Sequence, residues 1–502
     1  MHVANPRHWL ALVAIMLAFL PVVLDMTILT VAMPTLTLTL TLALGASAAE
    51  VLWIMDIYPL LMAGLLVPMG TLADRLGNRR LLLIGLVVFG VASLLAALAS
   101  TTTWLIAARV LLAFGGAMIM PCVLGIIRRT FEDEQERATA LGLWSMVAAA
   151  GAALGPLIGG ALLEYFWWGA VFLVNVPIML VVAPLVLLLL DRDQQTTPSD
   201  WAPGQALLLI AGMLALIYGV KAAFGATQPL ALAVPIALLG VALLSIFVRL
   251  QLHSTTPMLE LSLFNQPAIV AGIAMAMVTC GTLTGVELTL AQELQYMLGK
   301  TPLQAATFMI PIMAAAALGG PLAGYLIRLG SLRWVASASL WLCAMTMALM
   351  ASADLHQPGF LVPAILALLG LTLSIGLTTA SIAILGSVEA SKGAAAGSLE
   401  ATAYELGTAL GITFFGMFMS VVFAHMLELP VDLAQPLADR AMRSIGDSYI
   451  VAQGLIAPQS GALIKAASEA FSTTHSVLLM TCSAMMGSLG VFVFLMLKGC
   501  RH

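Results

Sequence analysis

Residues 70–80 decide the fold class, and they read Gly70-Thr71-Leu72-Ala73-Asp74-Arg75-Leu76-Gly77-Asn78-Arg79-Arg80. This stretch connects two apolar segments that are each long enough to cross a bilayer. Small residues let two helix ends approach closely, and Gly77 permits a tight turn. An ordinary positively charged loop explains the arginines but neither the glycines nor Asp74, which is placed to pair with an Arg or to meet a helix N-terminus.

The composition around this stretch is that of a membrane protein. Hydrophobic residues make up 61% of the 502 residues, charged residues 9%, and the mean hydropathy is +1.06. A soluble protein carries about a quarter charged residues, so most of this surface is expected to face the lipid bilayer. A net charge of -4 with scattered basic residues indicates no binding of nucleic acid.

The chain carries no signature of a cofactor, a metal site or an enzyme. Its five Cys occur singly without a Cys-x-x-Cys spacing, and its seven His lack metal-ligand spacing. Gly299-Lys300-Thr301 resembles the end of a phosphate-binding loop, but position 294 is Leu, so the leading Gly is missing. An ATP-driven pump is therefore not expected, and no nucleophile–base arrangement is evident.

Apolar stretches of about 20 residues predict membrane-spanning helices. We count fourteen, near 9–33, 50–72, 81–100, 103–126, 138–162, 168–190, 203–222, 229–250, 267–291, 303–327, 333–352, 360–385, 394–424 and 474–497. With the N-terminus inside, 14 of the 20 Lys and Arg fall on the inner side. Arg109 lies within a span, and five fall outside, namely Lys221, Lys300, Arg440, Arg443 and Lys465. Because positive charge is retained in the cytoplasm, both termini are predicted to be cytoplasmic.

A repeat predicts two halves. Gly320-Pro321-Leu322-Ala323 matches Gly70-Thr71-Leu72-Ala73 at the corresponding connection, 250 positions later. We expect a six-helix bundle over 1–195, two inserted spans over 196–260 and a second bundle over 261–502. A more polar outer segment over 425–474 is either a solvated loop with short helices or a lid over the outer mouth of the pathway.

Span five carries a glycine ridge. Gly151, Gly155 and Gly159 lie on one helix face, and Pro156 removes a backbone hydrogen bond and kinks the helix. Such a ridge serves close helix packing, and it also suits a rocking surface between bundles. We therefore expect conformational gating to involve this ridge and the 70–80 connection, that is Gly70, Asp74, Arg75, Gly77, Arg79, Gly151, Gly155, Pro156 and Gly159.

Two acidic residues in the first two spans predict polar sites. A carboxylate within a span normally faces a cavity or a partner. A rise of 1.5 Å per residue places Asp25, Asp56 and Arg109 at similar heights, so the three are expected to share one polar cluster, with Arg109 as the counter-ion of Asp25. A purely structural pair is the alternative. Asp56 lies between Trp53 and Tyr58, which suits an organic cation through charge and cation–π contact, although both aromatics are also typical interfacial anchors.

The second half contributes further acidic residues. Glu405 falls near mid-membrane and is the best candidate there for a second proton or cation site. Glu287 and Glu400 are candidate substrate contacts, or they reach the outer and inner water respectively. Glu164 is expected at the outer edge without a special role.

These motifs together resemble the fourteen-span drug:proton antiporter branch of the major facilitator superfamily. Residues 70–80 are similar to its loop signature, 151–160 to its exporter signature and 24–34 to its span-one signature. Leu105-Ile106-Ala107-Ala108-Arg109 resembles the span-four motif, although Leu112 and Ala113 stand where Gln and Gly are usual. The likeness is greatest to bacterial pumps for quaternary ammonium compounds and methyl viologen.

The resemblance implies a proton-driven exporter of organic cations in the bacterial plasma membrane, with the all-α major facilitator fold. It implies a proton-linked role for Arg109, and the positions of Asp25 and Glu405 within their spans add them to the expected proton-coupling residues. We expect no cofactor and a monomer. Three alternatives stay open: an exporter of a metabolite such as an amino acid or siderophore, an importer, and a non-transporting sensor or scaffold. The glycine-rich span five disfavours the importer, and the buried charges disfavour the sensor.

Overall fold

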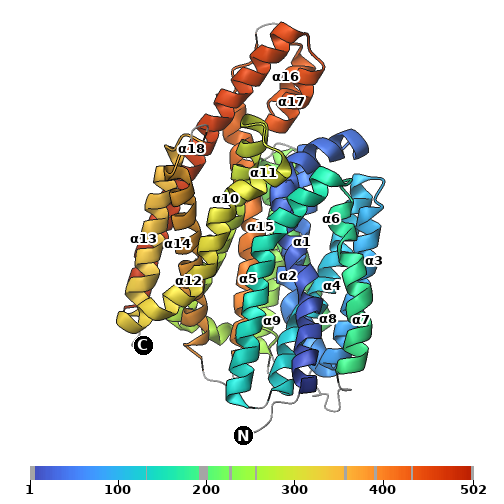
Figure 1. Ribbon diagram of the computed structural model, residues 1–502, viewed down its shortest axis with the longest axis vertical. Coiled ribbons are helices and arrows are strands. Elements are labelled where there is room, and N and C mark those ends of the chain that lie inside the picture. Colours follow the sequence, from blue (N-terminus) through green and yellow to red (C-terminus); the bar gives the residue numbers. More distant parts are fainter. Residues whose placement is uncertain are drawn as a thin grey trace.

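A computed structural model describes residues 6–131, 133–190, 202–224, 229–254, 257–355, 359–388, 393–430 and 433–498. All regular secondary structure in these residues is helical (Figure 1). Fourteen of the helices are long and apolar enough to cross a membrane, which is the number predicted from the sequence.

The helices fall into three groups along the chain. The first group comprises α1 (Pro6–Leu44), α2 (Ala48–Leu76), α3 (Asn78–Ala97), α4 (Thr102–Thr130), α5 (Glu134–Tyr165), α6 (Ala170–Leu173) and α7 (Asn175–Leu189). The second is the pair α8 (Pro203–Phe224) and α9 (Leu230–His253). The third comprises η1 (Leu261–Asn265), α10 (Pro267–Gln292), η2 (Glu293–Met297), α11 (Pro302–Phe308), α12 (Ile310–Leu329), α13 (Leu332–Ala351), α14 (Leu361–Leu385), α15 (Gly393–Met426), α16 (Gln435–Ala441), α17 (Ile445–Gln453) and α18 (Ala457–Met496).

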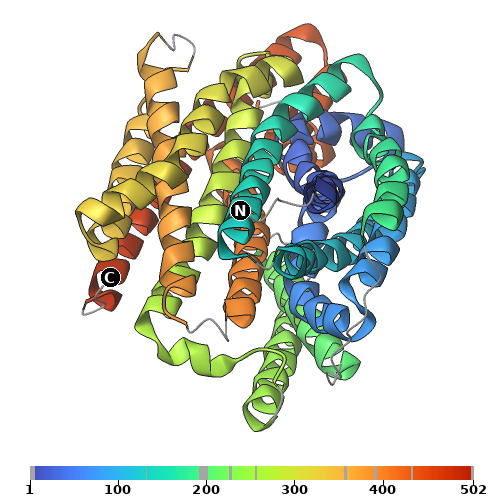
Figure 2. The same ribbon diagram turned by 60° about the horizontal axis from the view of Figure 1, so that its bottom comes forward.

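Two large apolar cores match the first and third groups. One core is built from residues of α1 to α7 and the other from residues of α10 to α18. Figure 2 shows these halves side by side, with the paired helices α8 and α9 at their shared edge. Leu288 of α10 and Ile412 of α15 belong to the first core, so the halves touch through side chains of both. Because 191–201 and 255–256 lie outside the described residues, the exact boundaries of the three units remain predictions.

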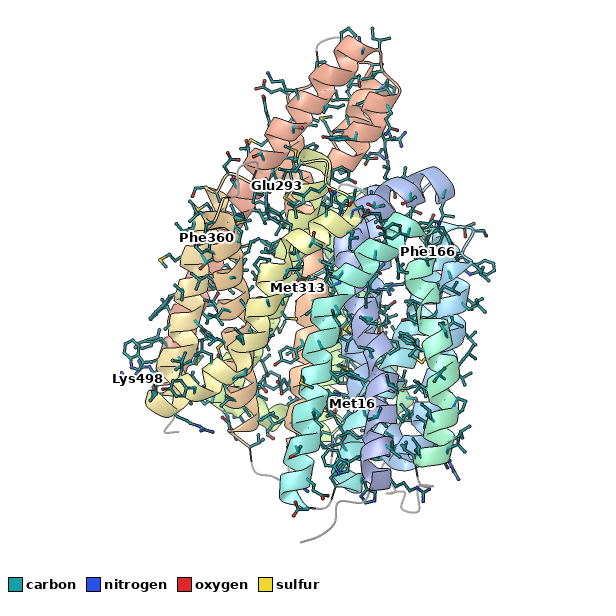
Figure 3. All side chains as sticks on the ribbon, viewed as in Figure 1. Met16, Phe166, Glu293, Met313, Phe360 and Lys498 are labelled. Atoms are coloured by element: carbon teal, nitrogen blue, oxygen red, sulfur yellow. The ribbon has the colours of Figure 1, made fainter. Side chains whose placement is uncertain are left out.

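The two ends of the bundle carry different helices and side chains. α1 begins and α18 ends towards the end opposite α16 and α17 (Figure 1). Figure 3 places Lys498 at that end, whereas the exposed Phe166 and Phe360 lie at the other. We call the end near α16 and α17 the outer end, following the prediction from the charge distribution.

Three helices differ from the sequence prediction. α1 continues to Leu44 instead of ending near residue 33, and α18 begins at Ala457 instead of near residue 474. The expected tenth span is interrupted at Met309, which separates α11 from α12. The hydropathy window marks where apolar character fades, but a helix continues as long as its backbone hydrogen bonds are satisfied. The N-terminal part of α18 therefore projects beyond the bundle with α16 and α17 (Figure 1).

The 70–80 connection is almost entirely helical. Residues 70–76 end α2 and residues 78–80 begin α3, so Gly77 alone separates the two helices. Gly77 has φ 92°, a backbone conformation that other residues rarely adopt. The structure thus confirms the tight turn at Gly77 and corrects the idea of a longer loop.

Candidate functional site

Asp25 of α1 and Arg109 of α4 form an ion pair inside the first half. Both are buried, at 2% and 1% exposure. Arg109 also donates from Nε to the carbonyl oxygen of Ile54 in α2 at 2.9 Å, and its guanidinium lies 4.6 Å from the centre of the Tyr58 ring. The pair expected from helix heights is therefore present, and it ties three helices together.

Asp56 of α2 is held by a partner that the sequence analysis did not assign. Its carboxylate accepts hydrogen bonds from Lys221 of α8 and, at 2.9 Å, from the hydroxyl of Thr413 in α15. Asp56 is fully buried and Lys221 is 9% exposed. Three elements from the three groups of helices thus meet at one carboxylate. Asp56–Lys221 and Asp25–Arg109 are therefore two separate ion pairs rather than one shared cluster.

The charge distribution assigns Lys221 to the outer side, and the structure adds that its side chain is buried. Lys221 is in the last turn of α8, and it points inward to Asp56 instead of outward to solvent. α8 packs against α2, where a methyl group on Gly64 would lie 2.9 Å from the side chain of Ile210. The signal that was available is a lone Lys at the end of an apolar span, because such a charge needs a buried partner.

The two aromatic residues beside Asp56 have different surroundings. The ammonium of Lys221 lies 4.4 Å from the centre of the Trp53 ring, which in turn lies 5.9 Å from the Tyr218 ring. Tyr58 is fully buried under Arg109, so it is not an interfacial anchor. Trp53 and Lys221 together form a cation–π contact next to a carboxylate.

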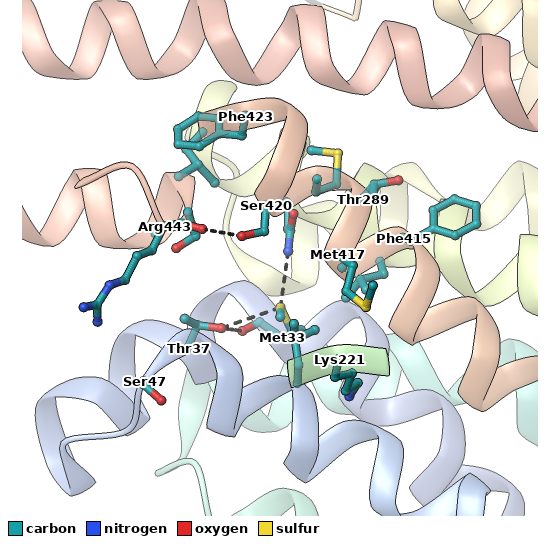
Figure 4. A pocket seen from close by; sticks show the side chains of 18 of the residues that line it. Met33, Thr37, Ser47, Lys221, Thr289, Phe415, Met417, Ser420, Phe423 and Arg443 are labelled. Carbon is teal, nitrogen blue, oxygen red and sulfur yellow. Dashed lines mark hydrogen bonds between the residues drawn. The ribbon is translucent and has the colours of Figure 1, made fainter. Parts of the chain in front are cut away.

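A cavity of about 500 Å³ opens beside this pair, between the two halves and towards the outer end (Figure 4). Trp53, Tyr218 and Lys221 line one side of it. The rest of the wall is rich in aromatic and thioether groups, with a few hydroxyl groups, from Met33, Thr37, Thr289, Phe415, Met417, Met419, Ser420, Phe423 and Phe471. Its size and apolar lining with few polar groups are those of a small-molecule site.

One face of α15 continues the site towards the middle of the bundle. Thr408 and Ile412 border a small space that Tyr58 and Arg109 share. Glu405, one turn before Thr408, is 5% exposed, and its Oε2 has no hydrogen-bond partner among the described residues. Glu405 lies about 12 Å along α15 from Thr413, the residue that contacts Asp56. The acidic groups of both halves therefore follow the same interface.

The other two acidic candidates are not part of the cavity wall. Glu400 is 8% exposed and accepts a hydrogen bond from the Tyr404 hydroxyl at 2.7 Å, so it does not reach open water. Glu287 is half-buried in α10, next to Leu288, which does line the cavity. Substrate contact by either residue remains a prediction.

The glycine ridge of α5 packs against α1. Methyl groups on Gly151 and Gly159 would lie 3.1 Å from Leu20 and 2.9 Å from Ile28, and one on Gly155 would overlap Thr27. Pro156 is buried within α5. The packing role is thus visible, whereas movement along this ridge remains a prediction.

The 70–80 connection contacts α4 and α7. Arg79 donates to the carbonyl oxygen of Leu187 at the end of α7, at 2.8 Å. Asp74 and Arg75 are exposed, and Gly70 faces Pro121 of α4, which a methyl group would approach to 3.9 Å. The gating role of these residues remains a prediction.

The outer segment borders the cavity. Arg443 to Gly446, at the start of α17, form part of the cavity wall. Ser420 donates to the carbonyl oxygen of Arg443 at 3.0 Å. Tyr449 of α17 donates to the carbonyl oxygen of Tyr296 at 2.6 Å, and Tyr296 donates to that of Pro34 in α1 at 3.0 Å. This outer cap, residues 433–456, therefore borders the cavity and contacts both halves, whereas a role as a lid remains a prediction.

Comparison with known proteins identifies the class first. The Major Facilitator Superfamily profile matches residues 15–412, and the chain belongs to this family of membrane transporters. Its fold is shared by a bacterial homologue of the human lysosomal transporter Spinster, solved in an inward-facing and unoccupied conformation. That likeness has a TM-score of 0.69 at 18% identity, over 99% of both chains.

Sequence relatives then narrow the class. The chain is 43% identical to the methyl viologen resistance protein SmvA of Salmonella typhimurium over 97% of both chains. It is 35% identical to the multidrug efflux pump LfrA of Mycolicibacterium smegmatis, over 93% of this chain and 92% of that protein. The chain is thus a drug efflux transporter and a multi-pass protein of the bacterial inner membrane.

Proposed function

We propose that this transporter exports cationic, amphipathic drugs in exchange for protons. The substrates would be quaternary ammonium compounds, viologens, acridine dyes and cationic biocides. The observation that carries this proposal is Asp56, a buried carboxylate whose partner Lys221 lies against the Trp53 ring and lines, with Trp53, an apolar cavity of about 500 Å³. A delocalised cation would gain binding free energy from the carboxylate, from the aromatic face and from the apolar wall.

Proton coupling is proposed for the Asp25–Arg109 pair. Protonation of Asp25 removes the charge that holds Arg109, while its deprotonation restores the pair. Arg109 borders the small space shared with Thr408 and Ile412 of the other half, so a movement of its guanidinium reaches the interface. Glu405 is proposed as a second proton site because its buried carboxyl group faces the same interface from α15.

Alternating access requires that the halves separate at one end at a time. In this structure α1 and α5 are hydrogen-bonded to the second half at the outer end, where Thr35 contacts Gln295 at 2.7 Å. Thr301 contacts Glu164 at 2.8 Å, so Glu164 has a contact that the sequence did not indicate. These contacts support a state in which the outer end is closed, and export requires that they break.

The proposal is tested by efflux of methyl viologen from proteoliposomes under an imposed pH gradient. Wild type is compared with Asp25→Asn, Asp56→Asn and the exposed control Glu469→Gln. We expect gradient-driven efflux by wild type and the control, and its loss in Asp25→Asn. Asp56→Asn should weaken the apparent affinity for cations most. If wild-type protein moves no cation under any gradient, the proposal is wrong, and a metabolite exporter becomes the leading function.

A further inference from the structure

The ammonium of Lys221 occupies the place that suits a substrate cation. It forms an ion pair with Asp56 and lies 4.4 Å from the centre of the Trp53 ring, so it already uses both groups that recognise positive charge. Trp53, Tyr218 and Lys221 also line the cavity, so a bound drug and the lysine would compete for the same surface. Asp56 retains one buried oxygen, Oδ1, without a partner among the described residues.

We propose that Lys221 is a tethered competitor cation, which a substrate displaces from Asp56 and which returns to expel it. The proposal rests on the proposed export of cations and adds a specificity-determining residue to it. A neutral molecule cannot displace the lysine, because Asp56 would then lose its counter-charge. A cation can displace it, because its own positive charge then compensates Asp56. The inserted helices would then take part in transport, because Lys221 belongs to α8.

Charge balance gives the physical reason. A fully buried carboxylate without a compensating charge is strongly unfavourable, so an empty site needs a cation of its own. Lysine suits exchange better than arginine, since its ammonium is a point charge on a flexible stem, whereas a guanidinium binds a carboxylate in a fixed fork. Displacement moves the ammonium along the wall of the outer cavity, which Lys221 lines.

The test measures transport and binding of tetraphenylphosphonium, a cation whose charge does not depend on pH. Lys221→Met removes the charge and nearly keeps the length, and the assay is run at about pH 8, above the ordinary pKa of a carboxyl group. We expect the apparent KM and the Kd to fall at least about tenfold, and the maximal rate to fall because release is slower. Lys221→Arg should raise KM, because the arginine is harder to displace.

A matched control is Lys465→Met, which removes a lysine that is exposed on α18. It should leave KM unchanged. The double variant Asp56→Asn/Lys221→Met provides a readout that a merely structural role would not change. Asp56→Asn alone leaves the lysine unpaired and repelling the substrate, so the added Lys221→Met should lower its KM.

The outcomes separate the two proposals. If wild type neither binds nor transports the cation, the proposed function fails. If wild type does both, but Lys221→Met leaves KM and Kd unchanged or raises them, the competitor role is wrong and the function stands. If Lys221→Met does not fold, Lys221→Arg and the double variant decide: an unchanged KM in the first, or no recovery in the second, overturns the proposal.

Discussion

Two buried ion pairs in this transporter join neighbouring helices. Asp25 joins α1 to α4, and Asp56 joins α2 to α8. Removing one partner of a buried pair costs about 3–5 kcal/mol because the other charge stays uncompensated. Pairs of this kind therefore hold helices firmly while both partners are charged, and they release them when a proton or another cation takes a partner's place.

The outer cap has its own buried carboxyl group, outside the spans. Burial raises the pKa of Asp447 in α17 above its ordinary value of 3.8, although Ser444, Arg440 and Arg443 act in the opposite direction. The folded state then binds this proton more tightly than the unfolded state. The stability that this preference contributes is complete below the ordinary pKa, and it is lost as the pH rises through the raised pKa.

We therefore predict that the outer cap opens more readily as the pH rises through that window. Hydrogen exchange of residues 445–453, corrected for the intrinsic pH dependence of exchange, should show falling protection in wild type. Asp447→Asn should remove this pH dependence, because its amide does not titrate. Asp439→Asn, at an exposed position of α16, should behave as wild type. An unchanged slope in Asp447→Asn would contradict the prediction.

At the scale of the element, glycine decides how closely α5 approaches α1. Gly155 faces Thr27, where even a methyl group would overlap the threonine side chain. Gly142, in the same helix, is exposed and has nothing within 4 Å of an added methyl group. Both glycines lie in the same helix, but only Gly155 contacts another helix. Comparing substitutions at the two positions therefore distinguishes the effect of helix packing from that of helix propensity.

We predict that Gly155→Ala destabilises the protein by about 1–3 kcal/mol, since the two helices must move apart. Gly142→Ala should leave stability unchanged or raise it by up to about 1 kcal/mol, because alanine favours the helix. Thermal unfolding of purified protein in detergent measures both, and cation efflux is followed in parallel. Equal unfolding temperatures for the two variants would show that the ridge is not tightly packed.

For the molecule as a whole, the sequence predicted best those features that depend only on position along the chain or along one helix. The number of spans follows from hydropathy, and the Asp25–Arg109 pair follows from heights along two helices. The Asp56–Lys221 pair could not be predicted in this way, because α8 is apolar all round and shows no stripe that tells which face packs on α2. The short helices α16 and α17 were expected in the outer segment, but the early start of α18 at Ala457 was not, because hydropathy reports contact with lipid, not helix formation.

The contacts at the outer end lead to the final prediction, which tests separation of the halves. Glu164 of α5 and Thr301, the residue that caps α11, are hydrogen-bonded at 2.8 Å. We replace both by Cys and join them with a short, reducible cross-linker. Transport should stop when the link forms and return after reduction, because export needs this end to open. Lys465→Cys/Glu469→Cys, an exposed pair on α18 alone, should tolerate the same linker.

A transport rate that survives complete cross-linking at Glu164 and Thr301 would show that these two positions stay together throughout the cycle. The substrate would then leave by another route, such as between the outer cap and α15, where Ser420 contacts Arg443. Loss of transport that reduction restores, with an unaffected control pair, would instead tie export to opening between α5 and α11. Gly160 of α5 also packs on Leu303 of α11. This opening would therefore move α5, the same glycine-rich helix that packs on α1.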